Sequence, residues 1–153
     1  MFRVKHTGGE GQEMEDPHMD RREAAQMNPL QLAYMGDSVW EMMVRSYLAA
    51  KRKNVHHMHL ECVRLVNAAS QAGIMKRLRP LLSEEEAQIA QRGRNAHARH
   101  PSPRHQDPGD YAEATGFEAL LGFLYLTGDL SRLREIRDAV LENVETEDRT
   151  RVG

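Results

Sequence analysis

The chain has 153 residues, enough for one domain with a sizeable core, and 40% of them are hydrophobic while only 5% are aromatic. Leucine, alanine and methionine supply most of the apolar mass, which favours helices over strands. The longest apolar stretch in a helical pattern, residues 119–126, is far too short to cross a bilayer, and the N-terminus lacks the apolar core of a signal peptide. The single cysteine, Cys62, excludes an internal disulfide framework and fits a reducing cytosol. We therefore expect an all-α, cytoplasmic protein with no membrane association.

Positive charge is concentrated in the middle of the chain, although the net charge of the whole chain is only −2. Residues 45–106 contain twelve lysines and arginines, four acidic residues and six of the eight histidines. A basic segment inside a nearly neutral chain is typical of a protein that binds a polyanion such as nucleic acid. The solvated faces of ordinary helices would account for the same charges, so this alternative stays open.

Helix signals follow one another from residue 28 onwards. Asn28 is a good N-cap and Pro29 a good first helical residue, which predicts a helix from about residue 30 to 50. Helices are also predicted over 55–67, 68–78 and 84–96, and a capping box of Ser83 and Glu86 opens the last of these. Three prolines and a glycine predict a loop over 98–110, and two further helices follow, over 111–126 and from Asp129 to about residue 144.

The two ends of the chain lack this periodic pattern. Residues 1–27 contain scattered acids and glycines, which predict a disordered tail with helix, if any, only near its end. Residues 146–153 are polar and are predicted to fray. The predicted domain therefore spans residues 28–145.

The predicted helix over residues 30–50 is apolar on more than one side. One face carries Leu32, Met35, Val39, Met42 and Met43, and another carries Leu30, Tyr34, Val44 and Leu48. A helix of this kind is buried on more than one side. Together with Trp40, the pattern predicts a homodimer formed through this helix.

Asp37 and Glu118 are single acids inside apolar helical segments, at residues 32–44 (LAYMGDSVWEMMV) and 116–126 (GFEALLGFLYL). Burial of an unpaired carboxylate is costly because the charged form loses its hydration. Two such acids on two helices predict a shared metal ion or a proton to be transferred, with a buried polar pair as the plainer alternative.

Three short segments resemble the ribonuclease III family in both order and spacing. Residues 34–39 (YMGDSV) resemble its signature helix, and residues 117–122 (FEALLG) resemble its second catalytic helix. Residues 91–96 (QRGRNA) resemble a segment typical of Mini-ribonuclease III, the short form that consists of the nuclease domain alone. The resemblance implies an all-α, homodimeric, Mg²⁺-dependent endonuclease that cuts double-stranded RNA. It also implies a role in maturation of the 23S ribosomal RNA precursor, with a ribosomal protein as a candidate helper.

The resemblance implies that Asp37 and Glu118 are both the catalytic residues and the metal ligands. Full-length members carry two further carboxylates, one turn before each of these acids, where this chain has Ala33 and Thr115. Mini-ribonuclease III proteins commonly lack them too, so the departures support the short form and favour one Mg²⁺ per site. Glu41, one turn after Asp37, and Thr115 are candidates for supporting the metal ligands. Glu41 has an ordinary exposed helix acid as its alternative.

RNA binding is expected from the basic segment that follows. Arg92 and Arg94 flank Gly93, which we expect to keep the backbone open, and Arg99 and Arg104 lie in the proline-rich loop. Such a loop suits recognition of A-form RNA by its shape. The dense histidines at 56–59 lack the ligand spacing of a zinc site.

Two alternative functions remain for the whole protein: a catalytically inactive double-stranded-RNA-binding module of the same fold, and a helical scaffold protein with a buried acid pair.

Overall fold

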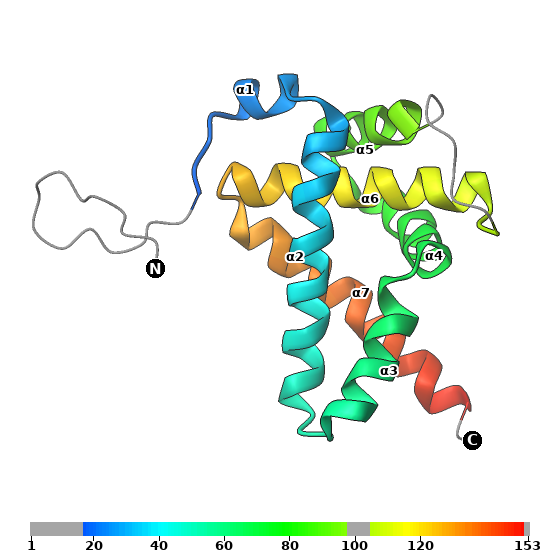
Figure 1. Cartoon of the computed structure of the whole chain (residues 1–153). Helices are drawn as coiled ribbons and strands as arrows, with labels where there is room; N and C mark the ends of the chain where they lie inside the picture. Colours follow the sequence, from blue (N-terminus) through cyan, green and yellow to red (C-terminus); the bar gives the residue numbers. More distant parts are fainter. Residues whose placement is uncertain (1–16, 98–104, 152–153) are drawn as a thin grey trace, which may run out of the picture.

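The computed structural model describes residues 17–97 and 105–151, and these residues form helices without any strand (Figure 1). This confirms the all-α prediction. The helices are α1 (Arg21–Gln26), α2 (Pro29–Ala50), α3 (Val55–Val66), α4 (Ala68–Leu78), the short 3-10 helix η1 (Arg79–Leu81), α5 (Glu84–His97), α6 (Pro108–Leu126) and α7 (Leu130–Arg151). None of the helices described is long and apolar enough to pass through a lipid bilayer.

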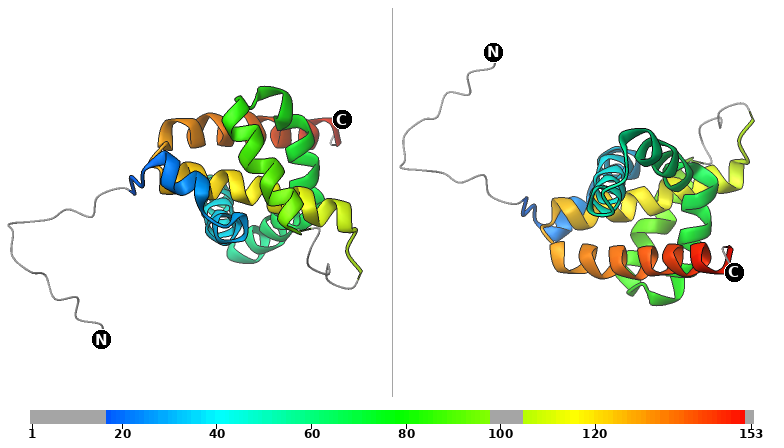
Figure 2. Two further views of the ribbon diagram at one scale, coloured as in Figure 1. Left: turned by 90° about the horizontal axis from the view of Figure 1, so that it is seen from above. Right: turned by 90° about the horizontal axis from the view of Figure 1, so that it is seen from below.

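Helix α6 forms the centre of the core. It contacts α2, α4 and α5 along its length and also touches α1 and α7, and the two views in Figure 2 show these helices arranged around it. Its residues from Glu113 to Phe117 and from Ala119 to Leu124 are all buried. A helix that is apolar on all sides is stable only inside a shell of other helices, so the remaining elements are positioned by α6.

Helices α2 and α6 cross with their backbones in contact. A Cβ atom placed on Gly36 of α2 would lie 1.6 Å from the Glu118 carbonyl oxygen, and one placed on Gly122 of α6 would lie 1.9 Å from the Leu32 carbonyl oxygen. Neither position has room for any side chain. The two glycines therefore determine how closely the helices approach.

Trp40 anchors this crossing from within the protomer. Its ring packs edge-on against Phe117 at a centroid distance of 5.2 Å, and its indole Nε1 donates a hydrogen bond to the Leu65 carbonyl. Because only 1% of Trp40 is exposed, it cannot contribute to a subunit interface. The prediction that placed Trp40 with the partner-facing residues was wrong, whereas Met42 is 69% exposed. A large aromatic side chain gains stability when its whole ring is removed from water. For Trp40 the core of the protomer already provides this burial.

The local helix signals are confirmed. The Asn28 side chain accepts a hydrogen bond from the Leu30 amide, and Pro29 is the first residue of α2. In the capping box, the Ser83 amide donates to Glu86 and the Glu86 amide donates to the Ser83 hydroxyl. Helix α6 begins at Pro108 rather than at the predicted residue 111. Asp107 caps this helix, and proline is well suited to its first turn.

Glu86 also receives a buried ion pair from α7. Arg132 Nε and Nη2 donate to its two carboxylate oxygens at 2.8 and 2.9 Å. Burial by itself raises the pKa of Glu86, but the hydrogen bonds from Arg132 and Ser83 outweigh this and leave the pKa below its usual range. The start of α5 is thereby fastened to α7.

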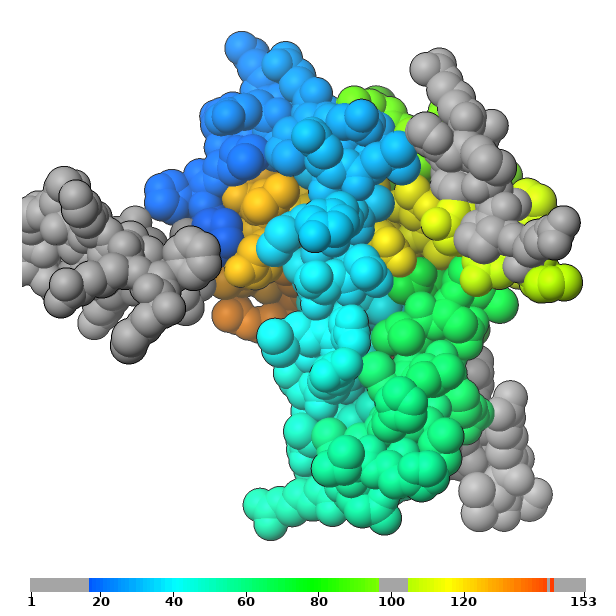
Figure 3. All heavy atoms as spheres, viewed as in Figure 1, coloured from blue at the N-terminus to red at the C-terminus, as the bar shows by residue number. Residues whose placement is uncertain are grey.

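Both predicted chain ends need correction. Residues 17–27, placed in a disordered tail, are folded against the core: the Met19 amide donates to the Leu126 carbonyl, Ala24 is fully buried, and Arg21 pairs with Glu85 and Asp129. Figure 3 shows this segment, in blue, lying against the end of α6. The residues that contact this segment are distant from it in sequence, so no periodic pattern within the segment predicts these contacts. At the other end α7 continues to Arg151, past the predicted fraying at residue 146.

The α2–α6 crossing predicts opposite effects for two glycine substitutions. Gly36→Ala should destabilise the protein by about 3 kcal/mol or more, because the added methyl group would overlap the α6 backbone. The matched control is Gly73→Ala on α4, where a Cβ meets nothing within 4 Å. That substitution should stabilise the protein by about 0.5–1 kcal/mol. Urea unfolding of both variants gives the comparison, and equal stability would contradict the contact.

Candidate functional site

The crossing of α2 and α6 brings the two predicted acids together. Gly36 lies on the backbone of Glu118, so Asp37, the next residue of α2, emerges beside the Glu118 side chain. Glu118 is half-buried, but Asp37 is exposed. The expectation that both carboxylates would be buried therefore holds only in part: Asp37 faces the solvent because the apolar sides of α2 turn toward α6 and α3. Water and ions have access to the pair through Asp37.

The surroundings of Glu118 disfavour its charged form. Burial, followed by the negative charge of Asp37, raises the pKa of Glu118 to about 7, and the side chain of Gln71 lowers it by a smaller amount. Within the described part of the chain, no lysine, arginine or histidine forms an ion pair with either acid. The two carboxylates are thus held close together without a compensating cation from the protein.

Gln71 is the third polar side chain at this place. It lies on α4, is only 2% exposed, and is near enough to Glu118 to influence its pKa. Its Nε2 nevertheless makes no hydrogen bond of normal geometry. Sequence reasoning missed this residue, because a glutamine within a helix carries no signal of its own.

The donor atoms at this site fit a hard divalent cation. Carboxylate oxygens from Asp37 and Glu118, with the amide of Gln71 beside them, are the type of group that Mg²⁺ prefers. Among residues 17–97 and 105–151, no cluster of three or more histidine, cysteine or acidic side chains is formed. Two carboxylates provide few protein ligands, which is typical of Mg²⁺ sites completed by water and substrate phosphate.

Glu41 and Thr115, the predicted supporting residues, have other partners. Glu41 forms an ion pair with Arg45, one turn further along α2, at 2.5 Å. The Thr115 hydroxyl donates to the Tyr111 carbonyl within α6 at 2.9 Å. Neither of these bonds involves Asp37 or Glu118, so a supporting role for Glu41 and Thr115 stays a prediction.

Arg92 and Arg94 both make contacts inside the protomer. The Arg92 guanidinium donates to the carbonyls of Ala25 and Met27, at the end of α1. Arg94 Nε lies 3.1 Å from a carboxylate oxygen of Glu113. Both arginines remain exposed, so their outer faces can still meet a polyanion. The other two predicted RNA-binding residues, Arg99 and Arg104, lie outside the described residues.

Gly93 does not keep the backbone open. The prediction that it would do so was wrong. It is buried, and a Cβ placed on it would lie 2.9 Å from Ala119 Cβ and 3.0 Å from Gly116 Cα. Gly93 and Gly116 therefore let α5 lie closely on α6. Their close approach holds α5, with its two arginines, against the helix that carries Glu118.

Glu113 is a further residue that the sequence did not single out. It is buried on α6, and Arg79 Nη2 and Arg94 Nε lie 2.5 and 3.1 Å from its two carboxylate oxygens. One acid therefore holds two exposed arginines, which come from η1 and α5. No spacing rule connects these positions, since they lie on separate elements.

Comparison with known proteins identifies the family of this chain. The family model of the ribonuclease III domain matches residues 30–129. A Mini-ribonuclease 3 from Symbiobacterium thermophilum is 43% identical over 118 residues, covering 76% of this chain and 90% of the relative. Another, from a Thermoanaerobacter species, is 42% identical and covers 78% of this chain and 84% of the relative.

A crystal structure shows the same architecture. A protein from Fusobacterium nucleatum superposes with a TM-score of 0.71 at 30% sequence identity, covering 77% of this chain and 94% of that one. The matched family domain contains both Asp37 and Glu118. The chain therefore belongs to the ribonuclease III family, and within it to the Mini-ribonuclease III branch.

Proposed function

We propose that Asp37 and Glu118 jointly hold one Mg²⁺ ion at which the phosphodiester bond of double-stranded RNA is hydrolysed. Membership of the ribonuclease III family makes the chain a double-stranded-RNA endoribonuclease. The observation that carries the metal assignment is the contact of Gly36 with the Glu118 backbone, which pairs the two carboxylates without a cation of the protein's own. When bound, Mg²⁺ neutralises charge developing on the phosphate and activates water.

The two carboxylates have different roles in this proposal. Asp37 is exposed and can meet a hydrated cation from solvent. Burial and the charge of Asp37 raise the pKa of Glu118 to about 7, so near neutral pH it is only partly ionised and its protonated fraction must lose a proton on binding the cation. Binding of Mg²⁺ should therefore release protons and should strengthen as the pH rises through 7.

Removal of either ligand should abolish cleavage without unfolding the protein. Asp37→Asn and Glu118→Gln keep the size of each side chain but weaken its bond to Mg²⁺, so the rate should fall by about a thousandfold or more. Cleavage of a labelled duplex RNA, with Mg²⁺ and then with EDTA, measures this, and circular dichroism checks the fold. Cleavage at the wild-type rate by either folded variant would disprove the assignment.

Glu118→Gln should also stabilise the metal-free protein at alkaline pH. The carboxyl pKa is raised from 4.5 to about 7 on folding. The folded state then binds more protons than the unfolded state in this window, so the contribution of Glu118 to stability is lost as the pH rises through 7. In EDTA, the Tm of Glu118→Gln should exceed that of the wild type at about pH 8 but not at about pH 5. Equal differences at the two pH values would contradict the raised pKa.

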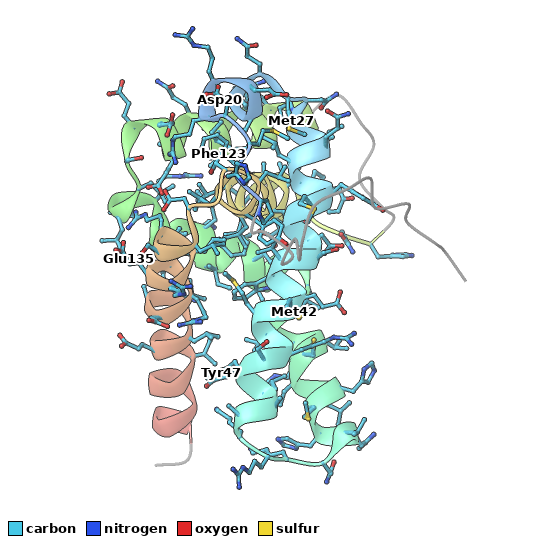
Figure 4. All side chains as sticks on the ribbon, turned by 90° about the vertical axis from the view of Figure 1, so that its left-hand side faces the viewer. Asp20, Met27, Met42, Tyr47, Phe123 and Glu135 are labelled. Atoms are coloured by element: carbon cyan, nitrogen blue, oxygen red, sulfur yellow. The ribbon has the colours of Figure 1, made fainter. Side chains whose placement is uncertain are left out.

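Homodimerisation is proposed through the side of α2 that faces α7. An apolar groove there is lined by Met35, Ser38, Val39, Met42, Met43, Tyr125, Leu130, Leu133 and Arg134. Figure 4 shows α2, labelled at Met42 and Tyr47, next to α7, labelled at Glu135. A symmetric dimer that covers this groove has two Asp37/Glu118 pairs, one for each strand of a duplex.

Charge placed at the groove should separate the subunits. Met42→Glu would put an unpaired carboxylate into a buried interface, so the variant should sediment as a monomer at micromolar concentration. The control is Val55→Glu, which changes an equally apolar, 81% exposed residue at the start of α3 and should leave the dimer intact. A wild-type protein that sediments as a monomer would refute the proposed dimer.

RNA binding is proposed for Arg92 and Arg94 on α5, together with Arg99 and Arg104 further along the chain. Arg94 is held by Glu113 and is exposed, so it can present its guanidinium to a phosphate. Arg92 also supports α1, through the Ala25 and Met27 carbonyls. Both arginines therefore have a structural contact beside the proposed contact with RNA: Arg92 with α1, and Arg94 with Glu113.

Arg94→Ala should weaken binding to all RNA duplexes about equally and reduce the slope of log K against log salt by about one. Its Tm should fall modestly, because the buried Glu113 loses one of its two arginine partners and keeps Arg79. Arg92→Ala should lower the Tm as well, because α1 loses its contact with α5. The measurement is duplex-RNA binding across a salt series, with duplex DNA of the same sequence for comparison. An unchanged slope for Arg94→Ala would remove it from the RNA-binding face.

The physiological substrate is proposed to be a stem of the 23S ribosomal RNA precursor, in the cytoplasm, with a ribosomal protein as a candidate helper. Support comes from the Mini-ribonuclease III branch to which the chain belongs. The competing view, an inactive RNA-binding module of the same fold, is opposed by the intact Asp37/Glu118 pair. Cleavage of a precursor stem by the purified protein separates the two views.

A further inference from the structure

Gln71 occupies a place where an apolar residue would serve the fold better. It is 2% exposed, on the side of α4 that also buries Ala72, Ile74, Met75 and Leu78. Among the described residues, its Nε2 is the one buried side-chain nitrogen or oxygen that lacks a hydrogen-bond partner. A buried polar group without a partner destabilises the folded state, and a non-polar side chain of similar shape would avoid that cost.

The position of Gln71 indicates what the amide is for. Helix α4 packs on α6, and the Gln71 side chain lies close enough to the Glu118 carboxyl group to influence its pKa, although it makes no hydrogen bond of normal geometry. Glu118 thus has Asp37, an open acid, and Gln71, a buried amide, as its polar neighbours. The solvent-facing group can meet a cation, whereas the buried group can only restrain the Glu118 side chain.

The chemistry of an amide suits this restraint. Asp37 and Glu118 already place two carboxylates next to each other, so an acid in place of Gln71 would add electrostatic repulsion. A lysine or arginine would occupy the place of the cation with its own positive charge. A glutamine amide is neutral and can donate to a carboxylate oxygen without competing for the metal. Residues that orient metal ligands in this way commonly change metal affinity about 10–100-fold when they are replaced.

We propose that Gln71 is a positioning residue for the metal site: its Nε2, unpaired in the metal-free protein, donates to one oxygen of Glu118 when that carboxylate binds a cation and leaves the other oxygen directed toward the ion. The inference rests on the proposed Mg²⁺ site of Asp37 and Glu118. The buried amide thus limits the orientations that Glu118 can take when a cation arrives. The unpaired amide of the metal-free protein is then the cost of a donor that gains its partner only in the metal-bound site.

The test replaces the amide by a non-polar side chain of similar length, Gln71→Met. Mg²⁺ affinity is measured by calorimetry and by the Mg²⁺-dependent rise in Tm. It should fall about 10-fold or more. In EDTA, the Tm should stay the same or rise, because a buried unsatisfied group has been removed. Cleavage should need more Mg²⁺ and should recover substantially when Mg²⁺ is saturating, with the KM for RNA unchanged.

Controls separate this inference from the proposed function. Gln88→Met makes the same change at an exposed position of α5 and should match the wild type throughout. Asp37→Asn should abolish Mg²⁺ binding. If it does not, the proposed metal site itself is wrong. If Asp37→Asn behaves as expected but Gln71→Met binds Mg²⁺ like the wild type, only the role of Gln71 is refuted.

A purely structural role for Gln71 would give a different result. Gln71→Met would then lower the Tm in EDTA and leave the affinity for Mg²⁺ unchanged. Gln71→Leu provides a second apolar replacement of different shape, so that one poorly packed variant does not decide the outcome. Failure of both variants to fold, while Gln88→Met folds normally, would show that the fold requires the amide and would overturn the proposal.

Discussion

The backbone contact between α2 and α6 is the constraint on which the rest of this molecule depends. Gly36 and Gly122 let the two helices cross at a distance that no side chain would allow. That distance places Asp37 next to Glu118, and it also brings Trp40 onto Phe117. The site and the core are therefore products of one helix crossing, and a change that widens it damages both. Gly93 and Gly116 also allow a close approach of the α5 and α6 backbones.

The buried acids of this fold fall into two kinds. Glu86 and Glu113 each receive arginines, from α7 in the first case and from η1 and α5 in the second. These pairs connect the outer helices to one another and to α6, and the charge of each acid is compensated within the protein. Glu118 has no such partner among the described residues; burial and Asp37 both act against its charge. A folded protein retains an uncompensated carboxylate at a cost in stability. The cost is explained if a cation from solution completes the site.

The arginines that pair with Glu113 also lie near the helix that carries the candidate metal ligand Glu118. The arginines that compensate Glu113 are exposed on their outer sides, so a buried acid holds basic groups at the surface near the helix that carries Glu118. Arg92 connects this region to α1, which packs against the end of α6. The N-terminal segment is therefore part of the support for the proposed RNA-binding face. The apolar groove beside α2 adds a surface that a second subunit would cover.

The sequence by itself determined the helices and the identity of the two acids, because these depend on neighbours close in the chain. Asn28 caps α2, Ser83 and Glu86 close a capping box, and the short motifs around Asp37 and Glu118 are continuous. Only the tertiary structure decided that Trp40 lies inside the protomer, that Asp37 is exposed, and that Gly93 serves helix packing. It alone showed Arg92 at the end of α1, and Gln71 beside Glu118. These contacts join residues tens of positions apart, and which residues meet depends on how closely the helices cross, which no local pattern records.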